Sequence, residues 1–350
     1  TLLIHEFVTG GGMAGQAIPP SWAAEGGAMR RALARDFASV PTIQVVMTLD
    51  QRFAEPPGPW HVLPIGPGEE PAVVRDWASR SDASLMIAPE TDGCLEQRAR
   101  WIEQAGGRSL GCHSDAIHLT ANKPRCNTWL RDHGVPAVLG QTLNPRDGLP
   151  PTARYPAILK PIDGAGCLHT YEVPSPDQFP EEALELDLAV LEPDLPGETL
   201  SGVLMVDRSK CAQLIGIGRQ SIVRERRRLA YNGGTFPIAW DGPEHVLRRA
   251  IDVIPGRQGV FGVDFLWNPV ERTIIVIEIN PRPTTSLVGL TGLLPPGRLA
   301  KAWLSCTRPW YETEPTHPSE PLANLAREVS RHTTHPVEFA PDGRITWHRR

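Results

Sequence analysis

The chain has 350 residues, of which 41% are hydrophobic and 21% are charged, and its 35 basic and 40 acidic residues leave a formal net charge of −5. This length and composition exclude a largely disordered chain, predict about two domains, and provide no basic footprint for nucleic acid. No apolar stretch reaches the roughly 18 residues that a membrane span requires, and the first residues lack the regions of a signal peptide, so we expect a cytoplasmic protein that contacts neither membrane nor nucleic acid.

Short apolar runs alternate with helical patterns in the first third of the sequence. This order predicts a βαβ sheet layered with helices, which makes residues 1–112 an α/β domain. Three prolines, at positions 56, 57 and 59, predict a surface loop within it. The expected strands and helices occupy residues 2–8, 22–37, 43–49, 72–79, 84–88 and 95–104.

The segment Gly10–Gly15 matches the GxGxxG spacing of a dinucleotide-binding turn. Pro19 and Pro20 follow closely, and prolines there would break the first turns of the helix that this motif requires. We therefore expect the helix to begin at Ser21, as its N-cap. The glycines then form either an anion-binding turn or a plain flexible turn, and an NAD(P)-dependent oxidoreductase that uses Gly10–Gly15 remains an alternative function.

Beyond residue 113 the pattern changes to an α+β region with antiparallel pairing. A helix is expected after Asn122, and residues 307–350 are expected to form an irregular tail with one helix and one strand. The other elements are expected at residues 155–160, 188–191, 200–206, 212–217, 244–253 and 260–279.

Residues 260–279 predict a strongly apolar β-hairpin. Because side chains alternate along a strand, Asp264, Glu278 and Asn280 should share one face of it. Asp and Asn are disfavoured in strands, and carboxylate and amide oxygens suit Mg²⁺ or Mn²⁺, so we predict a metal site on this face. The opposite, apolar face is expected to hold Val263, Phe265, Trp267, Ile275, Ile277 and Ile279.

Lysine is scarce, since only four of the 35 basic residues are lysines. Lys160 ends an apolar segment and precedes a loop that contains Gly164 and Gly166, and an ammonium beside such a loop suits phosphate oxygens. Lys123 lies at an expected helix start, where the helix dipole also favours phosphate. Taken alone, Lys123 would be interpreted as a surface cation.

The segment 189–201 predicts a strand, a Pro-rich turn and a second strand. Its backbone groups suit the edge of a purine, and Glu198 can accept hydrogen bonds from ribose hydroxyls. An ordinary turn would equally explain Gly197 and Glu198.

The order and spacing of these residues resemble those of the ATP-grasp ligases over residues 113 to 305. The resemblance implies a Rossmann-like pre-ATP-grasp domain over residues 1–112, then a two-subdomain ATP-grasp fold over 113–187 and 188–306, and a C-terminal tail over 307–350. It implies ATP and magnesium as cofactors. It places Lys123, Lys160, Gly164 and Gly166 at the phosphates, Glu192 and Leu195 at the adenine, Glu198 at the ribose, Asp264, Glu278 and Asn280 at the metal, and Arg282 at the reacting groups.

Within this superfamily, residues 5–12, 88–92 and 280–286 look like those of the tyramine–glutamate ligase branch of methanofuran biosynthesis. This similarity implies an amide formed between a glutamate carboxylate and an aromatic amine such as tyramine or tyrosine. The acid would attack the γ-phosphate of ATP to form an acylphosphate, which the amine then captures. A non-catalytic ATP-binding sensor is a further alternative.

Several other residues are candidates for the cleft. Arg219 and Tyr231 belong to substrate-side segments, and Arg219 joins Lys160 and Arg282 as a candidate catalytic residue. Glu6, Thr9 and Glu90 follow strands of the first domain and are either substrate contacts or structural caps. The expected partners are a small-molecule carboxylate and an amine, and a homodimer is a candidate assembly that the sequence does not settle.

Overall fold

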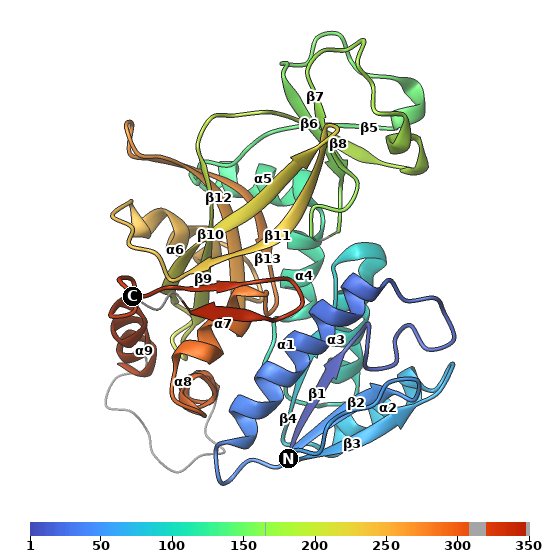
Figure 1. The fold of residues 1–350 in the computed structure, drawn as a ribbon, viewed down its shortest axis with the longest axis vertical. Helices are drawn as coiled ribbons and strands as arrows, with labels where there is room; N and C mark the ends of the chain where they lie inside the picture. The colour runs from blue at the N-terminus through green and yellow to red at the C-terminus, as the bar shows by residue number, and fades with distance from the viewer. Residues whose placement is uncertain (165, 308–319, 348–350) are drawn as a thin grey trace.

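The computed structural model of the chain describes residues 1–164, 166–307 and 320–347. Two sheets organise these residues, a parallel sheet near the N-terminus and a larger antiparallel sheet (Figure 1). Ala165, between the two loop glycines, and residues 308–319 and 348–350 of the expected tail lie outside the described residues. The predicted combination of an α/β region with an α+β region is confirmed.

The N-terminal sheet has the strand order β3-β2-β1-β4, and its neighbouring strands are all parallel. Every residue of β1, β2 and β4 is buried, because helices cover both faces of a parallel sheet. Its strands are β1 (Leu2–Glu6), β2 (Val45–Asp50), β3 (Trp60–Ile65) and β4 (Ala83–Ile87), and its helices are α1 (Pro20–Ala38), α2 (Glu70–Arg80) and α3 (Cys94–Gln104). Strand β3 was not predicted, since it is a half-exposed edge strand that directly follows the prolines.

The prediction that α1 begins at a Ser21 cap is wrong. The helix begins at Pro20, and Pro19 is its N-cap residue, without a capping side chain. Proline suits the first helical position because its ring fixes a helical φ and it has no N–H to leave unsatisfied. The helix therefore starts without a hydroxyl cap.

The glycines that follow β1 serve close packing. A Cβ atom on Gly10 would lie 2.2 Å from the carbonyl oxygen of Glu6, and one on Gly11 would lie 2.3 Å from Cγ2 of Ile65. Gly11 also has a φ of +115°, which side chains rarely tolerate. The turn after β1 therefore requires these glycines for steric reasons alone.

The large sheet is antiparallel throughout and has the strand order β13-β12-β9-β10-β11-β7-β6-β8-β5, and off this order β14 pairs with β11 and β15 pairs with β14. Four of its strands, β5 to β8, form a small lobe, and β9 to β13 form the main lobe (Figure 1). The small lobe contains β5 (Gln141–Leu143), β6 (Ala157–Pro161), β7 (Thr170–Val173) and β8 (Ala189–Pro193). The main lobe contains β9 (Glu198–Val206), β10 (Ala212–Glu225), β11 (Arg228–Phe236), β12 (Val260–Asn268) and β13 (Thr273–Asn280).

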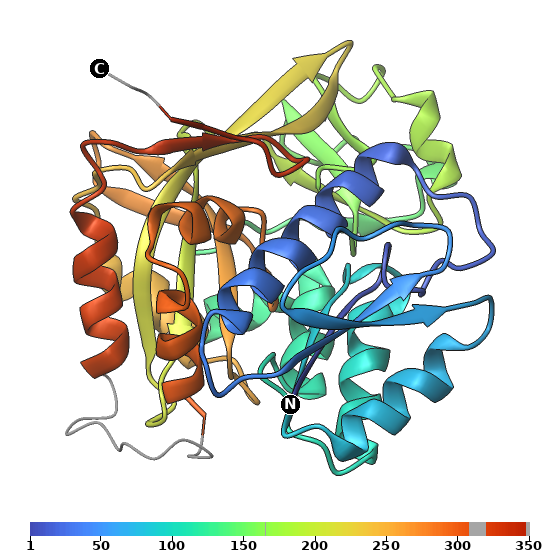
Figure 2. The ribbon, with the colours of Figure 1, turned by 60° about the horizontal axis from the view of Figure 1, so that its bottom comes forward.

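Helices cover the main lobe and connect it to the N-terminal domain. Helix α1 lies between the parallel sheet and α7 and α8 of the main lobe (Figure 2). These helices are α4 (Ser114–Ala121), α5 (Lys123–Asp132), α6 (Glu244–Asp252), α7 (Ser286–Leu293) and α8 (Arg298–Ser305). No helix among the described residues has both the length and the apolar character that crossing a bilayer requires.

The C-terminal region is more ordered than expected where the structure describes it. It contains α9 (Glu320–Ser330) and two strands rather than one, β14 (Val337–Phe339) and β15 (Ile345–Trp347). Strand β14 pairs with β11, and Phe339 is buried in the same core as α1, α7 and α9. Three-residue strands are too short to produce a readable alternation, so the sequence pattern did not predict them.

The buried apolar residues form three clusters. Two of them contain residues of both the parallel sheet and the main lobe, so these parts share their cores. The third consists entirely of small-lobe residues, including Leu159, Tyr171 and Leu191. The small lobe thus has a core of its own.

Because β14 contributes to the shared core, we expect Phe339→Ala to lower the free energy of unfolding by about 3 kcal/mol, the cost of truncating a buried aromatic side chain. Urea unfolding followed by tryptophan fluorescence measures this change. Thr346→Ala, at an exposed position on β15, is the matched control and should change the stability by less than about 0.5 kcal/mol. Equal stability of the two variants would contradict this role for the C-terminal hairpin.

Candidate active site

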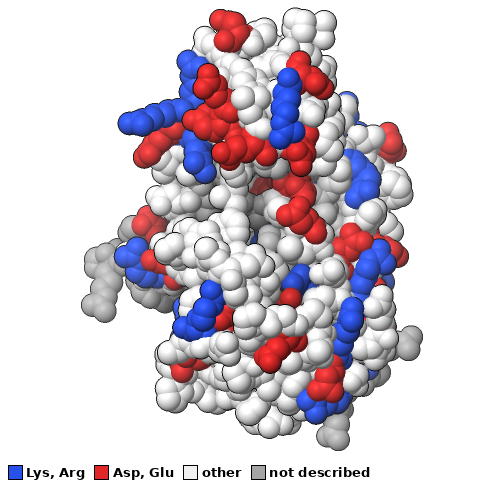
Figure 3. All heavy atoms as spheres, turned by 90° about the vertical axis from the view of Figure 1, so that its right-hand side faces the viewer, with Lys and Arg blue, Asp and Glu red and all other residues white. Residues whose placement is uncertain are grey.

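A cavity of about 570 Å³ is bounded by the small lobe, the main lobe and α1 of the N-terminal domain. On the face shown in Figure 3, the surface is hollowed, and acidic side chains gather above the hollow. The cavity brings together the residues that the sequence proposed for phosphate, nucleotide and metal. Those that line it are Lys123, Lys160, Gly164, Gly166, Glu192, Leu195, Glu198, Arg219, Tyr231, Asp264, Glu278, Asn280 and Arg282.

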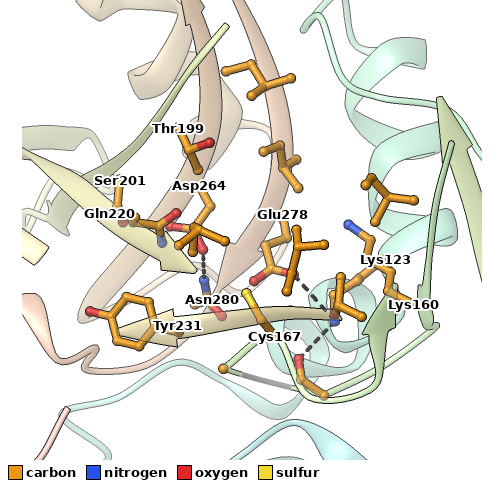
Figure 4. Close-up of a pocket in the computed structure, with 18 of the residues that line it drawn as sticks. Lys123, Lys160, Cys167, Thr199, Ser201, Gln220, Tyr231, Asp264, Glu278 and Asn280 are labelled. Carbon is orange, nitrogen blue, oxygen red and sulfur yellow. Dashed lines mark hydrogen bonds and ion pairs between the residues drawn. The ribbon is translucent and has the colours of Figure 1, made fainter. Parts of the chain in front are cut away.

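The β12–β13 hairpin supplies the acidic wall. Asp264 lies opposite Glu278 in the strand register, and Asn280 donates a hydrogen bond from Nδ2 to Oδ2 of Asp264 at 3.2 Å. All three side chains point into the same space (Figure 4). The structure thus gathers the two carboxylates and the carboxamide as the alternation predicted.

The predicted apolar face of this hairpin is partly wrong. A β-bulge shifts the register between Asp264 and Phe265, so Phe265 pairs with Val276. Ile274 and Val276 therefore join the buried core, whereas Ile275 is only partly buried and Ile277 lines the cavity. The bulge gives the site an apolar wall beside its acidic one.

Burial raises the pKa of Asp264 to about 7, with a further contribution from the negative charge of Glu278. Burial acts in the same direction on Glu278, but the ammonium groups of Lys123 and Lys160 outweigh it, so the pKa of Glu278 is lowered. The Nζ atom of Lys123 lies 3.4 Å from Oε2 of Glu278. Of the two carboxylates, Asp264 has the less complete compensation of its charge.

Lys160 forms the second buried ion pair of the cavity. Its Nζ atom lies 2.8 Å from Oε2 of Glu192, and both side chains are less than one-tenth exposed. Burial lowers the pKa of Lys160, but the carboxylates of Glu192 and Glu278 more than offset this and raise it overall. Lys160 is therefore a permanent positive charge directed into the cavity.

Lys123 links the start of α5 to the glycine loop. Its Nζ atom donates a hydrogen bond to the carbonyl oxygen of Gly164 at 2.8 Å, and its backbone N–H bonds to Ile162. Asn122, the N-cap residue, accepts a hydrogen bond from the N–H of Arg125 and so fixes this end of the helix. The lysine that seemed least distinctive in the sequence is thus buried between the loop and Glu278.

Another part of the cavity combines an apolar slot with a polar rim. Ile158, Leu195, Leu266 and Ile277 contribute the apolar surface. At the rim, Nη2 of Arg219 lies 3.1 Å from Oε2 of Glu198, and both side chains are substantially exposed. A flat aromatic group with a polar substituent would fit this arrangement.

Arg282 is held by the N-terminal domain. Its Nε atom donates to both carboxylate oxygens of Glu90, at 3.0 and 3.2 Å, and this buried pair spans 192 positions of the sequence. Burial lowers the pKa of Arg282, but Glu90 and Glu25 more than offset this and raise it. Glu90 therefore orients Arg282 rather than lining the cavity itself.

The remaining candidates separate into two groups. Tyr231 lines the cavity, and its hydroxyl lies 2.7 Å from Oγ1 of Thr285. Glu6 instead accepts hydrogen bonds from the N–H groups of Val8 and Thr9 and from the hydroxyl of Thr9, at 2.6 to 2.8 Å. Glu6 and Thr9 thus act as a cap after β1 and are not among the residues that line the cavity.

Among the cavity residues that the sequence analysis did not single out are Ser201, Gln220 and Glu25. Ser201 and Gln220 hydrogen-bond with Asp264 from neighbouring strands, and nothing in their local pattern marks them. Glu25 enters the cavity from α1. A lone carboxylate in the run of small residues from Ala23 to Ala28 is the signal that could have found it.

No group of three or more His, Cys, Asp and Glu side chains within the described ranges could by itself hold a metal ion. Asp264 and Glu278 supply only two such ligands, with Asn280 as an amide. This set is incomplete as a protein-only cage, but it matches Mg²⁺ sites that use one or two carboxylates together with substrate phosphates. The negative charge of the Asp264 carboxylate is only partly compensated by its neighbours, which agrees with a site that lacks one positive charge.

Comparisons with known proteins agree with this geometry. Residues 43–117 match the pre ATP-grasp 3 domain, and residues 120–286 match the ATP-grasp domain. The chain belongs to the ATP-grasp superfamily. Both domains of an ATP-grasp protein are thus present in the order that the sequence predicted.

Two of the curated relatives are ligases by name. The tyramine–L-glutamate ligase of Methanocaldococcus fervens is 30% identical over 212 residues, which cover 60% of this chain and 61% of the relative. The enzyme of the same name from Methanocaldococcus jannaschii is 29% identical, over 60% of this chain and 58% of the relative. The chain therefore spans about three fifths of the length of these ATP-grasp relatives.

Solved structures share the ATP-grasp fold. A protein from Archaeoglobus fulgidus assigned to the ATP-grasp superfamily superposes with a TM-score of 0.62 at 24% identity, covering 83% of this chain and 84% of that one. An L-amino acid ligase from Bacillus licheniformis superposes with a TM-score of 0.60 at 15% identity, covering 83% and 68%.

Because Glu90 neutralises a buried guanidinium, we expect Glu90→Ala to lower the free energy of unfolding by about 3 to 5 kcal/mol. Urea unfolding would show this loss. Asp76→Ala breaks the exposed pair with Arg80 on α2 and should cost less than about 1 kcal/mol. The double variant Glu90→Ala with Arg282→Met should recover part of the loss, and a loss no larger than that of Asp76→Ala would contradict the buried pairing.

Proposed function

We propose that this protein is an ATP-dependent carboxylate–amine ligase that forms an amide through an acylphosphate. We further propose that the acid is glutamate and the amine is tyramine, tyrosine or a relative, in methanofuran-type cofactor biosynthesis. The observation that carries the proposal is the cavity in which the buried Lys123 and Lys160 pair with Glu278 and Glu192, beside the carboxylate of Asp264. The names of the curated relatives support the choice of substrates.

In this proposal the nucleotide lies along the cavity. Its adenine occupies the apolar slot near Leu195 and Ile277, and Glu198 accepts hydrogen bonds from the ribose. The phosphates lie between Lys123 and Lys160, under the loop that carries Gly164 and Gly166. Two ammonium groups held by buried carboxylates are point charges of fixed position, which suits phosphate better than flexible surface lysines.

The divalent cation would be held by Asp264, Glu278 and Asn280. The fit rests on the incomplete charge compensation of Asp264 and on the oxygen-rich side chains of the hairpin. Bound there, the cation would neutralise phosphate charge during phosphoryl transfer. Lys123, which now contacts Glu278, would be free to contact phosphate as well.

The proposed reaction has two steps. An oxygen of the substrate carboxylate attacks the γ-phosphorus of ATP, the bond to the bridging oxygen breaks, and ADP leaves. The amine nitrogen then attacks the acyl carbon, phosphate leaves, and the nitrogen loses a proton to give the amide. Such chemistry depends mainly on positioning and charge, so the chain needs Arg282, Lys160 and Arg219 as cations rather than a nucleophilic side chain.

The acylphosphate must be protected from water. Because the small lobe has its own core, it can move against the main lobe without disrupting the packing of either. The segment between β6 and β7, which contains Gly164 and Gly166, is anchored by the bond from the N–H of Asp92 to Oδ2 of Asp163 at 3.0 Å. We propose that this loop closes over the phosphates.

The alternatives receive less support. The glycines after β1 are explained by close packing, and none of Gly10–Gly15 is among the cavity-lining residues, which disfavours a dinucleotide at that turn. A non-catalytic ATP sensor would need the residues proposed to bind the nucleotide, but it would not need the buried Arg282 beside them. ADP release that requires an acid distinguishes the ligase from both.

The ligase activity is tested by incubating the protein with ATP, Mg²⁺, L-glutamate and either tyramine or tyrosine. We expect ADP release that depends on glutamate, and a hydroxamate when hydroxylamine replaces the amine, because hydroxylamine captures acylphosphates. Coupled ADP assays and mass spectrometry of the product provide the measurements. ADP release that is indifferent to every carboxylate would contradict the proposal.

Lys160→Ala and Asp264→Ala should each lower turnover at least about a hundredfold, since each removes a charge directed at the phosphates or at the metal. Lys301→Ala, at an exposed lysine on α8, is the matched control and should retain wild-type turnover. Circular dichroism checks that all variants remain folded. Wild-type rates in the two cavity variants would refute these roles.

A further inference from the structure

Glu25 is a cavity-facing carboxylate for which the proposed chemistry has no task. Helix α1 carries it to the end of the cavity where Tyr231, Arg282 and Thr285 also lie. Its approach depends on Gly26, since a Cβ atom there would lie 2.5 Å from Cδ of Glu6. The close packing of α1 on the end of β1 therefore fixes the position of Glu25.

This carboxylate has no dedicated partner. Across the described residues, no side chain or backbone group forms a hydrogen bond or ion pair with Glu25, although it is partly buried. Burial raises its pKa, the positive charge of Arg282 opposes this, and the negative charge of Glu6 adds to it. An anion held in such a place is costly unless a ligand compensates it.

Arg282 and Glu6, the charged groups that act on Glu25, already have hydrogen-bond partners of their own. Arg282 uses Nε for both oxygens of Glu90 and Nη1 for the carbonyl oxygen of Pro283 at 3.3 Å. Glu6 is occupied by Val8 and Thr9. The guanidinium of Arg282 directs its hydrogen bonds to Glu90 and Pro283 and reaches Glu25 only through its charge, so this end of the cavity holds an anionic group beside a guanidinium edge.

We propose that Glu25 binds the α-ammonium group of the acid substrate, while Arg282 faces the carboxylate of that substrate that reacts with ATP. This inference rests on the proposed ligase function and adds a specificity rule to it. An anion and a cation side by side in one buried pocket complement a zwitterion. An acid without the amino group would leave Glu25 desolvated and unpaired, so the site should select α-amino acids over simple dicarboxylates.

The test compares L-glutamate with glutarate, which has the same two carboxylates and carbon chain but no amino group. In this comparison hydroxylamine replaces the amine substrate, so hydroxamate formation reports only on the acid. A separate ADP-release assay with L-glutamate and tyramine gives the KM for tyramine. We expect the wild-type protein to prefer L-glutamate in kcat/KM. Glu25→Gln should reduce that preference by about ten- to a hundredfold, the usual value of a hydrogen bond between charged groups.

Glu271→Gln is the matched control, because Glu271 is exposed in the β12–β13 turn, and it should keep the wild-type preference. Unfolding midpoints verify that both variants are folded. An unchanged preference in Glu25→Gln would overturn the proposal. An effect of Glu25→Gln confined to the KM for tyramine would also overturn it, since that result would assign the carboxylate to the amine substrate.

A binding measurement separates this inference from the ligase proposal. If the wild-type protein released no ADP with either acid, the proposed function would fail. The thermal shifts produced by L-glutamate and glutarate in the presence of ADP and Mg²⁺ would then decide the role of Glu25. A larger shift with L-glutamate that disappears in Glu25→Gln supports the inference, and equal shifts with both acids in the wild-type protein overturn it.

Discussion

The balance of buried charge in one cavity is the constraint on which the rest of this site depends. Ionised groups away from water are tolerated only when opposite charges or hydrogen bonds compensate them. Here Glu192 compensates Lys160, and Lys123 partly compensates Glu278. The charge of Asp264 is less compensated than that of Glu278 across the β12–β13 hairpin, so the resting site is short of positive charge where a cation would bind. The incompletely compensated carboxylate lowers the stability of the fold, and in the proposed function it would favour the binding of a cation.

The distribution of cores indicates how the cavity can open and close. The parallel sheet and the main lobe share two apolar clusters, so they form one rigid frame that holds Arg282, Glu90 and the hairpin. The small lobe has a separate core and brings Lys160 and Glu192 together. Movement of this lobe would carry the Lys160–Glu192 pair as a unit without breaking it. The charge that meets the phosphates would therefore be the same in both positions of the lobe.

The fold and the chemical groups of the site were largely predictable from local patterns, whereas their detailed roles were not. The α/β order of the first domain and the apolar hairpin follow from periodicity, and the scarcity of lysine directed attention to Lys123 and Lys160. The bulge after Asp264 could not be predicted, because no residue of the hairpin marks it, and it reversed the assignment of Ile277. Contacts across long separations, such as Glu90 with Arg282, depend on how domains pack and leave no local trace. The metal and nucleotide roles of the cavity residues stay predictions.

The two ends of the cavity draw on different parts of the chain, which in the proposed function would separate reaction chemistry from substrate choice. The groups proposed for the nucleotide and the metal come from the two lobes of the ATP-grasp domain, whereas Glu25 and the partner of Arg282 come from the N-terminal domain. Substitutions on α1 can therefore alter the charge that a substrate meets without disturbing the hairpin. Arg282 is the point of contact between the two functions, because the N-terminal domain orients it and the main lobe carries it. In the proposed function, packing of the two domains would thus couple recognition of the acid to the position of Arg282, the group proposed to face its reacting carboxylate.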